Sequence, residues 1–283
     1  MARRFFQVQD EQAFTASTAD LPVTFSPYLD TLDLSIRSTT AVAAVLTKTL
    51  LDQMQPLEIK LNNTAIISLR GSDLVALQNE FLGELPVIGE TTGLTSTGKV
   101  EGIAAPVWGQ PKHGTWTTRG NFVSQTNLTV GVISLEAEVV DKVLHEGYLS
   151  YLTAFFTPPS TGAFNQALDT TFNGDILGVL FFSTTVPTFA ADTISVREVQ
   201  AFVDGNLLFQ EEWKNLSRPG STGTVKNQPV VGTVFSQGFT NFLQNYAFWD
   251  TRDDPIPKGK KLTLKINSDD TSAIRIIPIV QVK

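Results

Sequence analysis

Cysteine is absent from this 283-residue sequence, and histidine occurs only at His113 and His145. Without cysteine the chain has no disulfide bonds, no thiol nucleophile and no metal site built on thiolates. Neither histidine has a second histidine at the spacing of zinc ligands, so we expect no metal site of that kind. The sequence also lacks a Gly-x-Ser-x-Gly nucleophile elbow, although a catalytic triad assembled only in space stays open.

Charged residues are scarce as well. They make up 17% of the chain, against roughly 25% in an average globular protein. The net charge of −7 argues against a dedicated nucleic-acid-binding protein, because such proteins meet phosphates with an excess of Lys and Arg. The 42% hydrophobic content excludes an intrinsically disordered chain. A surface poor in charge suits burial against other subunits.

Long apolar runs are also missing. The longest run, Ile176–Phe182, is much shorter than the roughly 20 residues that a membrane-spanning helix requires. The N-terminus becomes polar directly after Phe6, so we do not expect a secretory signal peptide. At roughly 150 residues per domain, the length suggests two domains.

The first half of the sequence shows a series of strand signals. Apolar and polar residues alternate in Leu32–Arg37 and again in Leu57–Leu61, which predicts two half-buried strands. Asn62-Asn63 then predicts a tight hairpin into a strand at 64–69, because Asn tolerates positive φ. A short helix is expected to begin near Ser72.

Further helices, a strand and a loop are predicted in the first half of the sequence. Apolar spacing indicates helices at 42–50 and around 141–146, and Leu128–Leu135 reads as a strand. The segment 86–120 is rich in Gly, Thr and Pro, and we interpret it as a long irregular loop.

The second half repeats the same order of elements. Strands are predicted at 176–182 and 194–203, with Asp204-Gly205 as a strong hairpin turn. A return strand at 206–209 leads into a short helix that contains Trp213. Further elements are a helix at 237–249 and strands at 261–266 and 274–282, which flank an expected terminal hairpin at 267–272.

The spacing of these two series indicates a duplication. Asn62 and Asp204 are 142 positions apart, about half of the 283 residues, and the same offset relates Val132 to Ile274. Residue identities barely match, so the repeat is one of pattern. A chance agreement between two β-rich domains is the alternative. The Pro-Pro-Ser-containing stretch 155–162 is the best linker candidate.

Motifs that could carry chemistry are weak. Gly93–Lys99 matches most of a phosphate-binding loop, but Val100 stands where Ser or Thr would hold Mg²⁺, so a surface loop is expected. Three carboxylate pairs occur, Glu211-Glu212, Asp253-Asp254 and Asp269-Asp270. We interpret them as parts of turns and short elements rather than as a glycosidase pair. Weak Ca²⁺ binding stays open at Asp253-Asp254 and at Asp269-Asp270.

Basic and aromatic residues occur together at the N-terminus, in Arg3, Arg4, Phe5 and Phe6. Such a combination suits an anionic lipid surface, and an ordinary disordered terminus is the alternative. A second basic cluster lies near the C-terminus and consists of Lys258, Lys260, Lys261 and Lys265.

The order of strand, short helix, strand, Asx/Gly hairpin, strand and helix, found twice at a half-chain offset, resembles the double jelly-roll major capsid proteins. That family builds tailless icosahedral viruses of bacteria and archaea, typically with an internal membrane. The resemblance rests on Leu32–Leu82 and Ile176–Leu216, and above all on Val199–Leu208 around Asp204-Gly205. The closing segment Leu262–Val282 also fits.

This resemblance implies an all-β fold with short helices, made of two tandem eight-stranded jelly rolls (a double jelly roll). The expected domains are an N-terminal arm at 1–17, a first jelly roll at 18–157, a linker at 158–163 and a second jelly roll at 164–283. The arm is expected to be disordered or extended, with no core strand before about Val23 and with Arg3, Arg4, Phe5 and Phe6 facing the virion interior.

The resemblance also implies a function. The chain would be a structural major capsid protein of the virion that forms pseudo-hexagonal homotrimers and tiles an icosahedral capsid. Expected partners are the chain itself, minor capsid, penton or spike proteins and the internal viral membrane, with no specific nucleic acid. The family implies no cofactor, no metal and no catalytic residues, so we do not expect an enzyme.

Two other classes of function remain open from the sequence. A carbohydrate- or receptor-binding β-sandwich, such as a virion spike or adhesin, would present a sugar site lined by exposed Trp108 or Trp116. A β-rich hydrolase would depend on His113 or His145.

Overall fold

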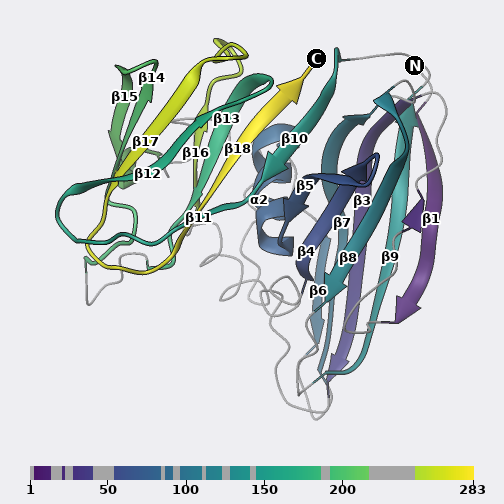
Figure 1. The fold of residues 1–283 in the computed structure, drawn as a ribbon. Coiled ribbons are helices and arrows are strands. Elements are labelled where there is room, and N and C mark those ends of the chain that lie inside the picture. Colours follow the sequence, from purple (N-terminus) through teal and green to yellow (C-terminus); the bar gives the residue numbers. More distant parts are fainter. Residues whose placement is uncertain are drawn as a thin grey trace. The chain divides into compact units, whose positions relative to one another are not determined.

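The computed structural model describes residues 3–13, 21–22, 28–40, 54–83, 87–91, 96–109, 113–122, 128–140, 145–185, 192–216 and 246–283 (Figure 1). The chain divides into two compact units, and the boundary between their described parts falls between Ser150 and Tyr151. In both units the described residues are mostly strands.

Two antiparallel sheets form the first unit. One has the order β1-β9-β3-β7-β6, and its strands are β1 (Arg3–Ala13), β9 (Leu128–Val140), β3 (Tyr28–Thr40), β7 (Ser96–Gly109) and β6 (Val87–Thr91). The other contains the order β5-β4-β8-β2, and its strands are β5 (Thr64–Leu69), β4 (Met54–Leu61), β8 (Trp116–Phe122) and β2 (Leu21–Pro22).

Two further segments complete the first unit around β5. Helix α2 (Gly71–Leu82) follows β5 directly and ends at Gly83, whose φ of +67° is the left-handed cap conformation that glycine favours. Strand β10 (Tyr148–Leu152) lies along the outer edge of β5, where the Ser150 hydroxyl donates to the Ile66 carbonyl at 2.9 Å.

The second unit is also built from two antiparallel sheets. The strands of one are β11 (Ala154–Phe156), β18 (Ile274–Val282), β13 (Asp175–Phe182) and β16 (Tyr246–Asp250), in that order. The strands of the other are β12 (Phe164–Thr171), β17 (Lys261–Asn267), β14 (Glu198–Val203) and β15 (Asn206–Glu212). Helix α3 (Trp213–Leu216) follows β15.

The two units share one topology, strand for strand. Among the described residues, and without the additional edge strand β6, the first unit has eight strands from β1 to β9, and the second has eight from β11 to β18. Counted along the chain, both have one sheet of order 1-8-3-6 and one of order 2-7-4-5. This is the jelly-roll arrangement. The prediction of two tandem eight-stranded jelly rolls with short helices is therefore confirmed.

The predicted hairpins occupy equivalent positions in the two rolls. Asn62-Asn63 joins strands four and five of the first roll, and Asp204-Gly205 joins those of the second. All four residues have positive φ, as a tight two-residue hairpin turn requires (Asn62 +50°, Asn63 +65°, Asp204 +49°, Gly205 +84°). Asn62 also reaches out of its own turn, because its carboxamide oxygen accepts from the Thr115 N–H at 3.0 Å.

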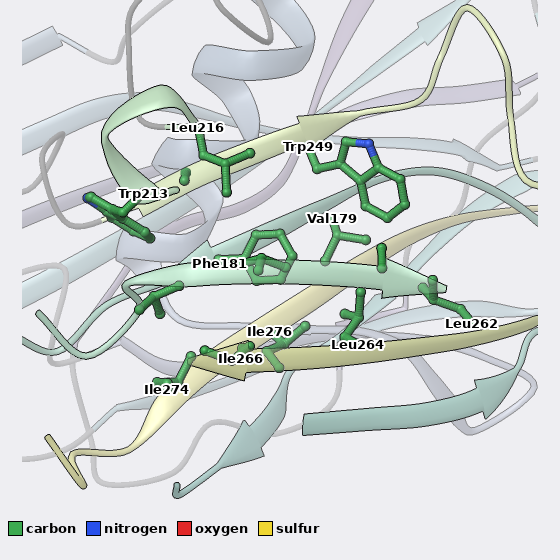
Figure 2. Packing of buried hydrophobic residues seen from close by; sticks show 14 of the residues in the cluster. Val179, Phe181, Trp213, Leu216, Trp249, Leu262, Leu264, Ile266, Ile274 and Ile276 are labelled. Atoms are coloured by element: carbon green, nitrogen blue, oxygen red, sulfur yellow. The ribbon is translucent and has the colours of Figure 1, made fainter. Parts of the chain in front are cut away.

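One layer of apolar side chains fills the second roll between its sheets (Figure 2). Phe181 and Trp249 come from one sheet, and Leu264 and Ile266 come from the other. In β17 the buried residues alternate with partly exposed ones, so only one face is inside. Strand β13 is different, because every residue after Asp175 is buried. A strand buried on both faces reads as an unbroken apolar run, which explains Ile176–Phe182.

Three predicted elements are wrong. The expected loop at 86–120 contains β6, β7 and the start of β8, because Thr and Gly residues that suggest a loop are held in strands by pairing with neighbours. The expected hairpin at 267–272 crosses between sheets, since β17 pairs with β12 and β14 while β18 pairs with β13 and β11. The end of the expected helix at 237–249 is strand β16, paired with β13.

The N-terminal segment also differs from expectation. A core strand begins at Arg3, well before Val23, because β1 pairs with β9 over most of its length. The expected linker at 158–163 connects β11 to β12 inside the second roll, and the boundary of the compact units lies earlier. The limits of separately folding domains stay a prediction. The expected helix at 42–50, and residues 237–245 and 141–144 of two others, lie outside the described residues.

Replacing Phe181 with Ala should destabilise the second roll by about 3–5 kcal/mol, because the ring is fully buried in the apolar layer. Phe155→Ala is the matched control: this ring is 62% exposed, and its loss should cost less than about 1 kcal/mol. Urea unfolding followed by tryptophan fluorescence measures both. Equal costs for the two variants would contradict the packing described here.

Candidate assembly surfaces

The N-terminal residues expected to face a membrane lie at the start of β1. Arg3 is opposite Val140 of β9, Arg4 is opposite Val139, and Phe5 and Phe6 continue the register. Backbone pairing with β9 therefore orders this segment within the first roll. β1 is the last strand of its sheet in the described part of the chain, so one of its edges ends the sheet.

Ion pairs gather where the loops of the second roll meet. The Asp204 carboxylate accepts from the Lys260 ammonium at 2.7 Å and from the Lys261 N–H at 3.0 Å. Asp175 accepts in the same way from Lys283 at 2.7 Å. The hydrogen bond from Lys260, with a smaller part from Lys261, lowers the pKa of Asp204. The contacts of Asp204 connect the β14–β15 turn to the start of β17.

The C-terminal lysine cluster is largely engaged inside the second unit. Lys261 forms an ion pair with Asp169 at 2.8 Å, and the Lys265 ammonium lies 4.9 Å from the centre of the Phe202 ring. Together with the Lys260 pair, two of the four lysines have a carboxylate partner and a third packs on an aromatic ring. The cluster is therefore a poor candidate for a lipid-binding surface.

The two histidines lie among aromatic rings. His145 stacks on Trp108 with ring centres 3.7 Å apart, and the ring of His113 is 5.2 Å from that of Tyr148. Burial lowers the pKa of His145, and the nearby Asp30 opposes that shift. Rings packed in this way join the segments that carry the two histidines to strands β7 and β10.

The tryptophans do not form the exposed sugar platform that a lectin would need. Trp116 is only 2% exposed, so the expectation of an exposed ring at this position is wrong. Trp108 is half-buried, and one face of its ring is covered by His145.

The paired carboxylates have local structural partners. Asp269 accepts from Arg197, Asp270 from Ser195 and Ser272, and Glu211 from Asn215, while Glu212 pairs with Lys214. Within the described residues, no cluster of three or more His, Asp or Glu side chains could hold a metal ion. None of the helices described is long and apolar enough to cross a membrane. In the loop that resembles a phosphate-binding motif, Ser96–Lys99 belong to β7.

A surface feature that the sequence reasoning missed lies on β15. Leu207 is 54% exposed and Leu208 is 58% exposed, and in the described part of the chain β15 is the last strand of its sheet. Counted from the hairpin turns, the equivalent of Leu208 in β5 is Ile66, which is buried. The available signal was the pair of adjacent leucines after Asp204-Gly205, since one of two neighbours in a strand must face away from the core.

Comparison with known proteins gives matches in structure alone. No family model matches the sequence, and no curated protein is similar to it. The STIV MCP matches with a TM-score of 0.73 at 7% identity, covering 100% of this chain and 97% of that one. The major capsid protein P2 from bacteriophage PM2 matches with a TM-score of 0.59 at 10% identity, covering 100% and 98%. PBCV-1 VP54 matches with 0.58 at 8% identity, covering 99% and 93%.

These similarities extend over nearly the whole of both chains, so they include both jelly rolls. At identities of this size they establish the fold and nothing finer. The chain has the double jelly-roll fold, in agreement with its strand order.

The Asp204 contacts predict a pH dependence of stability. Because its pKa is lower in the folded protein than the usual unfolded value of about 3.9, this carboxylate stabilises the fold above that pH, and the contribution disappears as the pH falls through the folded pKa. Asp204→Asn should lower the urea midpoint at pH 7, and this deficit should shrink as the pH falls below about 3.9. Lys260→Gln should reduce the same pH-dependent difference. A deficit of Asp204→Asn that stays constant from pH 7 down to pH 2 would contradict this assignment.

Proposed function

We propose that this protein is a major capsid protein that assembles with copies of itself into an icosahedral viral shell. The observation that carries the proposal is the end-to-end match of the chain to the STIV MCP, with a TM-score of 0.73 and coverage of 100% and 97%. A chain that contains two complete jelly rolls and matches such a protein over its whole length has the architecture of a shell subunit.

The duplication suits a hexagonal tile. Three copies around a threefold axis bring together six equivalent jelly rolls, which gives a trimer with a pseudo-hexagonal outline. Such an outline fills a shell surface by repeating one contact. The low charge of the chain agrees with extensive contact between subunits. Minor capsid, penton or spike proteins are the further partners proposed, and the virion is the proposed location.

A structural role without catalysis is part of the proposal. The histidines that a hydrolase would use pack against Trp108 and Tyr148, and the paired carboxylates hold turns and strand ends. The carbohydrate-binding alternative is not favoured, because Trp116 is buried.

We include in the proposal that the start of β1, with Arg3, Arg4, Phe5 and Phe6, faces an internal viral membrane. Arginine beside an anionic surface contributes on the order of 1 kcal/mol, within a screening length of about 8 Å. Two such residues hold one chain weakly, but three copies in a trimer act together. Lys260 and Lys261 of the C-terminal cluster form ion pairs within the second unit and are the weaker candidates for such a contact.

The purified protein should sediment as a trimer, at three times the 30.9 kDa of one chain, and should form shell-like particles or hexagonal arrays at high concentration. Analytical ultracentrifugation and negative-stain electron microscopy measure these outcomes. A stable monomer at micromolar concentration, or glycoside or ester hydrolysis that His113→Ala abolishes, would overturn the proposed function.

The trimer should bind vesicles that contain anionic lipid weakly, and binding should fall as salt rises. Arg3→Ser/Arg4→Ser should lose most of this binding and keep the fold, whereas a deletion of residues 1–7 would also remove pairs between β1 and β9. Arg197→Ser/Lys214→Ser removes the same charge from the second unit and should still bind. Equal loss in both double variants in a flotation assay would reject the role of the β1 arginines.

A further inference from the structure

The outer edges of two equivalent strands differ between the jelly rolls. β5 and β15 are both the fifth strand of a roll and the last of the 2-7-4-5 sheet. In the first roll, β10 lies along the outer edge of β5, and Ser150 donates to the Ile66 carbonyl there. In the second roll, no strand among the described residues lies along the outer edge of β15.

The side chains at these two edges also differ in solvent exposure, being buried at the covered edge and exposed at the other. Ile66 is 7% exposed, whereas Leu208 at the equivalent position is 58% exposed. Leu207, one residue earlier, is 54% exposed. A strand that ends its sheet and exposes adjacent leucines, as β15 does among the described residues, is a template for pairing with another strand, and proteins cover or blunt such edges. A strand paired along this edge would bind the backbone of β15 and cover the two leucines.

The strand that covers β5 suggests which strand would cover β15. β10 comes directly before β11, where the second roll begins, so the edge of one roll is covered by the segment that leads into the next. By the same rule, the edge of β15 would be covered from the start of the next roll. Around a trimer that roll is the first roll of a neighbouring copy, and its first described strand is β1, the counterpart of β11.

β1 is suited to this position. It is the last strand of its own sheet in the described part of the chain, so one of its edges is the end of that sheet. It has 11 residues and β15 has 7, so β1 is long enough to pair along the whole of β15. Beyond the residues proposed to face the membrane, its sequence includes the apolar Val8, which suits a neighbour that exposes Leu207 and Leu208.

We propose that the outer edge of β15 in one copy pairs with the outer edge of β1 in a neighbouring copy, and that this strand pairing holds the trimer together. The proposal rests on the proposed capsid function. The two surfaces are different, so the contact is heterologous, and it closes into a ring when the rotation between copies is one third of a turn. Backbone hydrogen bonds supply much of such a contact.

The absence of cysteine permits a direct test. Leu208→Cys is combined with one further cysteine, placed in turn at each position from Arg4 to Gln9 of β1, and the purified protein is mildly oxidised. Because a disulfide needs Cα atoms about 4.4–6.8 Å apart, we expect covalent dimers and trimers on a non-reducing gel, with a maximum at one or two β1 positions. Because the Leu208 side chain is exposed, its replacement with cysteine should leave the fold intact.

The controls separate this contact from others. Leu82→Cys, a leucine that is 41% exposed on α2, is combined with the same β1 cysteines and should give no such maximum. Leu208→Cys alone should stay unlinked, and efficient dimers from this single variant would show β15 pairing with β15 and overturn the proposal. A link within one copy, seen as a monomer of altered mobility, would also overturn it.

Sedimentation of the same samples separates failure of this contact from failure of the capsid function. A trimer that gives no cross-linking maximum at any β1 position rejects the β15–β1 pairing and leaves the capsid function standing. A monomer rejects both.

Discussion

A jelly roll depends on two sheets that enclose a layer of apolar side chains. In the second roll, rings such as Phe181 and Trp249 meet the aliphatic side chains of Leu264 and Ile266 across that layer. Burial of this kind is the main favourable term in folding. The strands follow from it, because only an alternating or wholly apolar segment can take a place in one of the sheets.

The order of strands explains which connections are tight. In an arrangement of 1-8-3-6 and 2-7-4-5, strands four and five are the only consecutive pair in one sheet, and every other connection must cross to the opposite sheet. The two-residue turns Asn62-Asn63 and Asp204-Gly205 lie at that position in both rolls. Connections that cross from one sheet to the other do not require a two-residue turn. The extra strand β6 adds one further pairing between neighbours in the chain, with β7.

Charged and aromatic side chains in this protein connect loops and turns to neighbouring segments. Asp204 receives bonds from Lys260 and Lys261, and His145 stacks on Trp108. Among the surfaces of the described residues, the edge of β15 stands out because its equivalent in the first roll is covered.

The sequence by itself determined the strands and turns whose signals are local. Alternation marked β3 and β4, the apolar run marked β13, and residues that tolerate positive φ marked the two hairpins, since each signal depends only on neighbouring residues. The half-chain offset between the hairpins was enough to indicate the duplication.

Only the tertiary structure decided how strands distant in the chain pair with one another. β17 and β18 look like a hairpin in the sequence but belong to opposite sheets, and β1 becomes a core strand because β9, more than a hundred residues later, pairs with it. The exposure of Leu208 against the burial of Ile66 was likewise beyond the sequence, because it depends on whether another strand lies alongside. Such pairings are made by backbone groups that all residues share, so composition and periodicity carry little record of them.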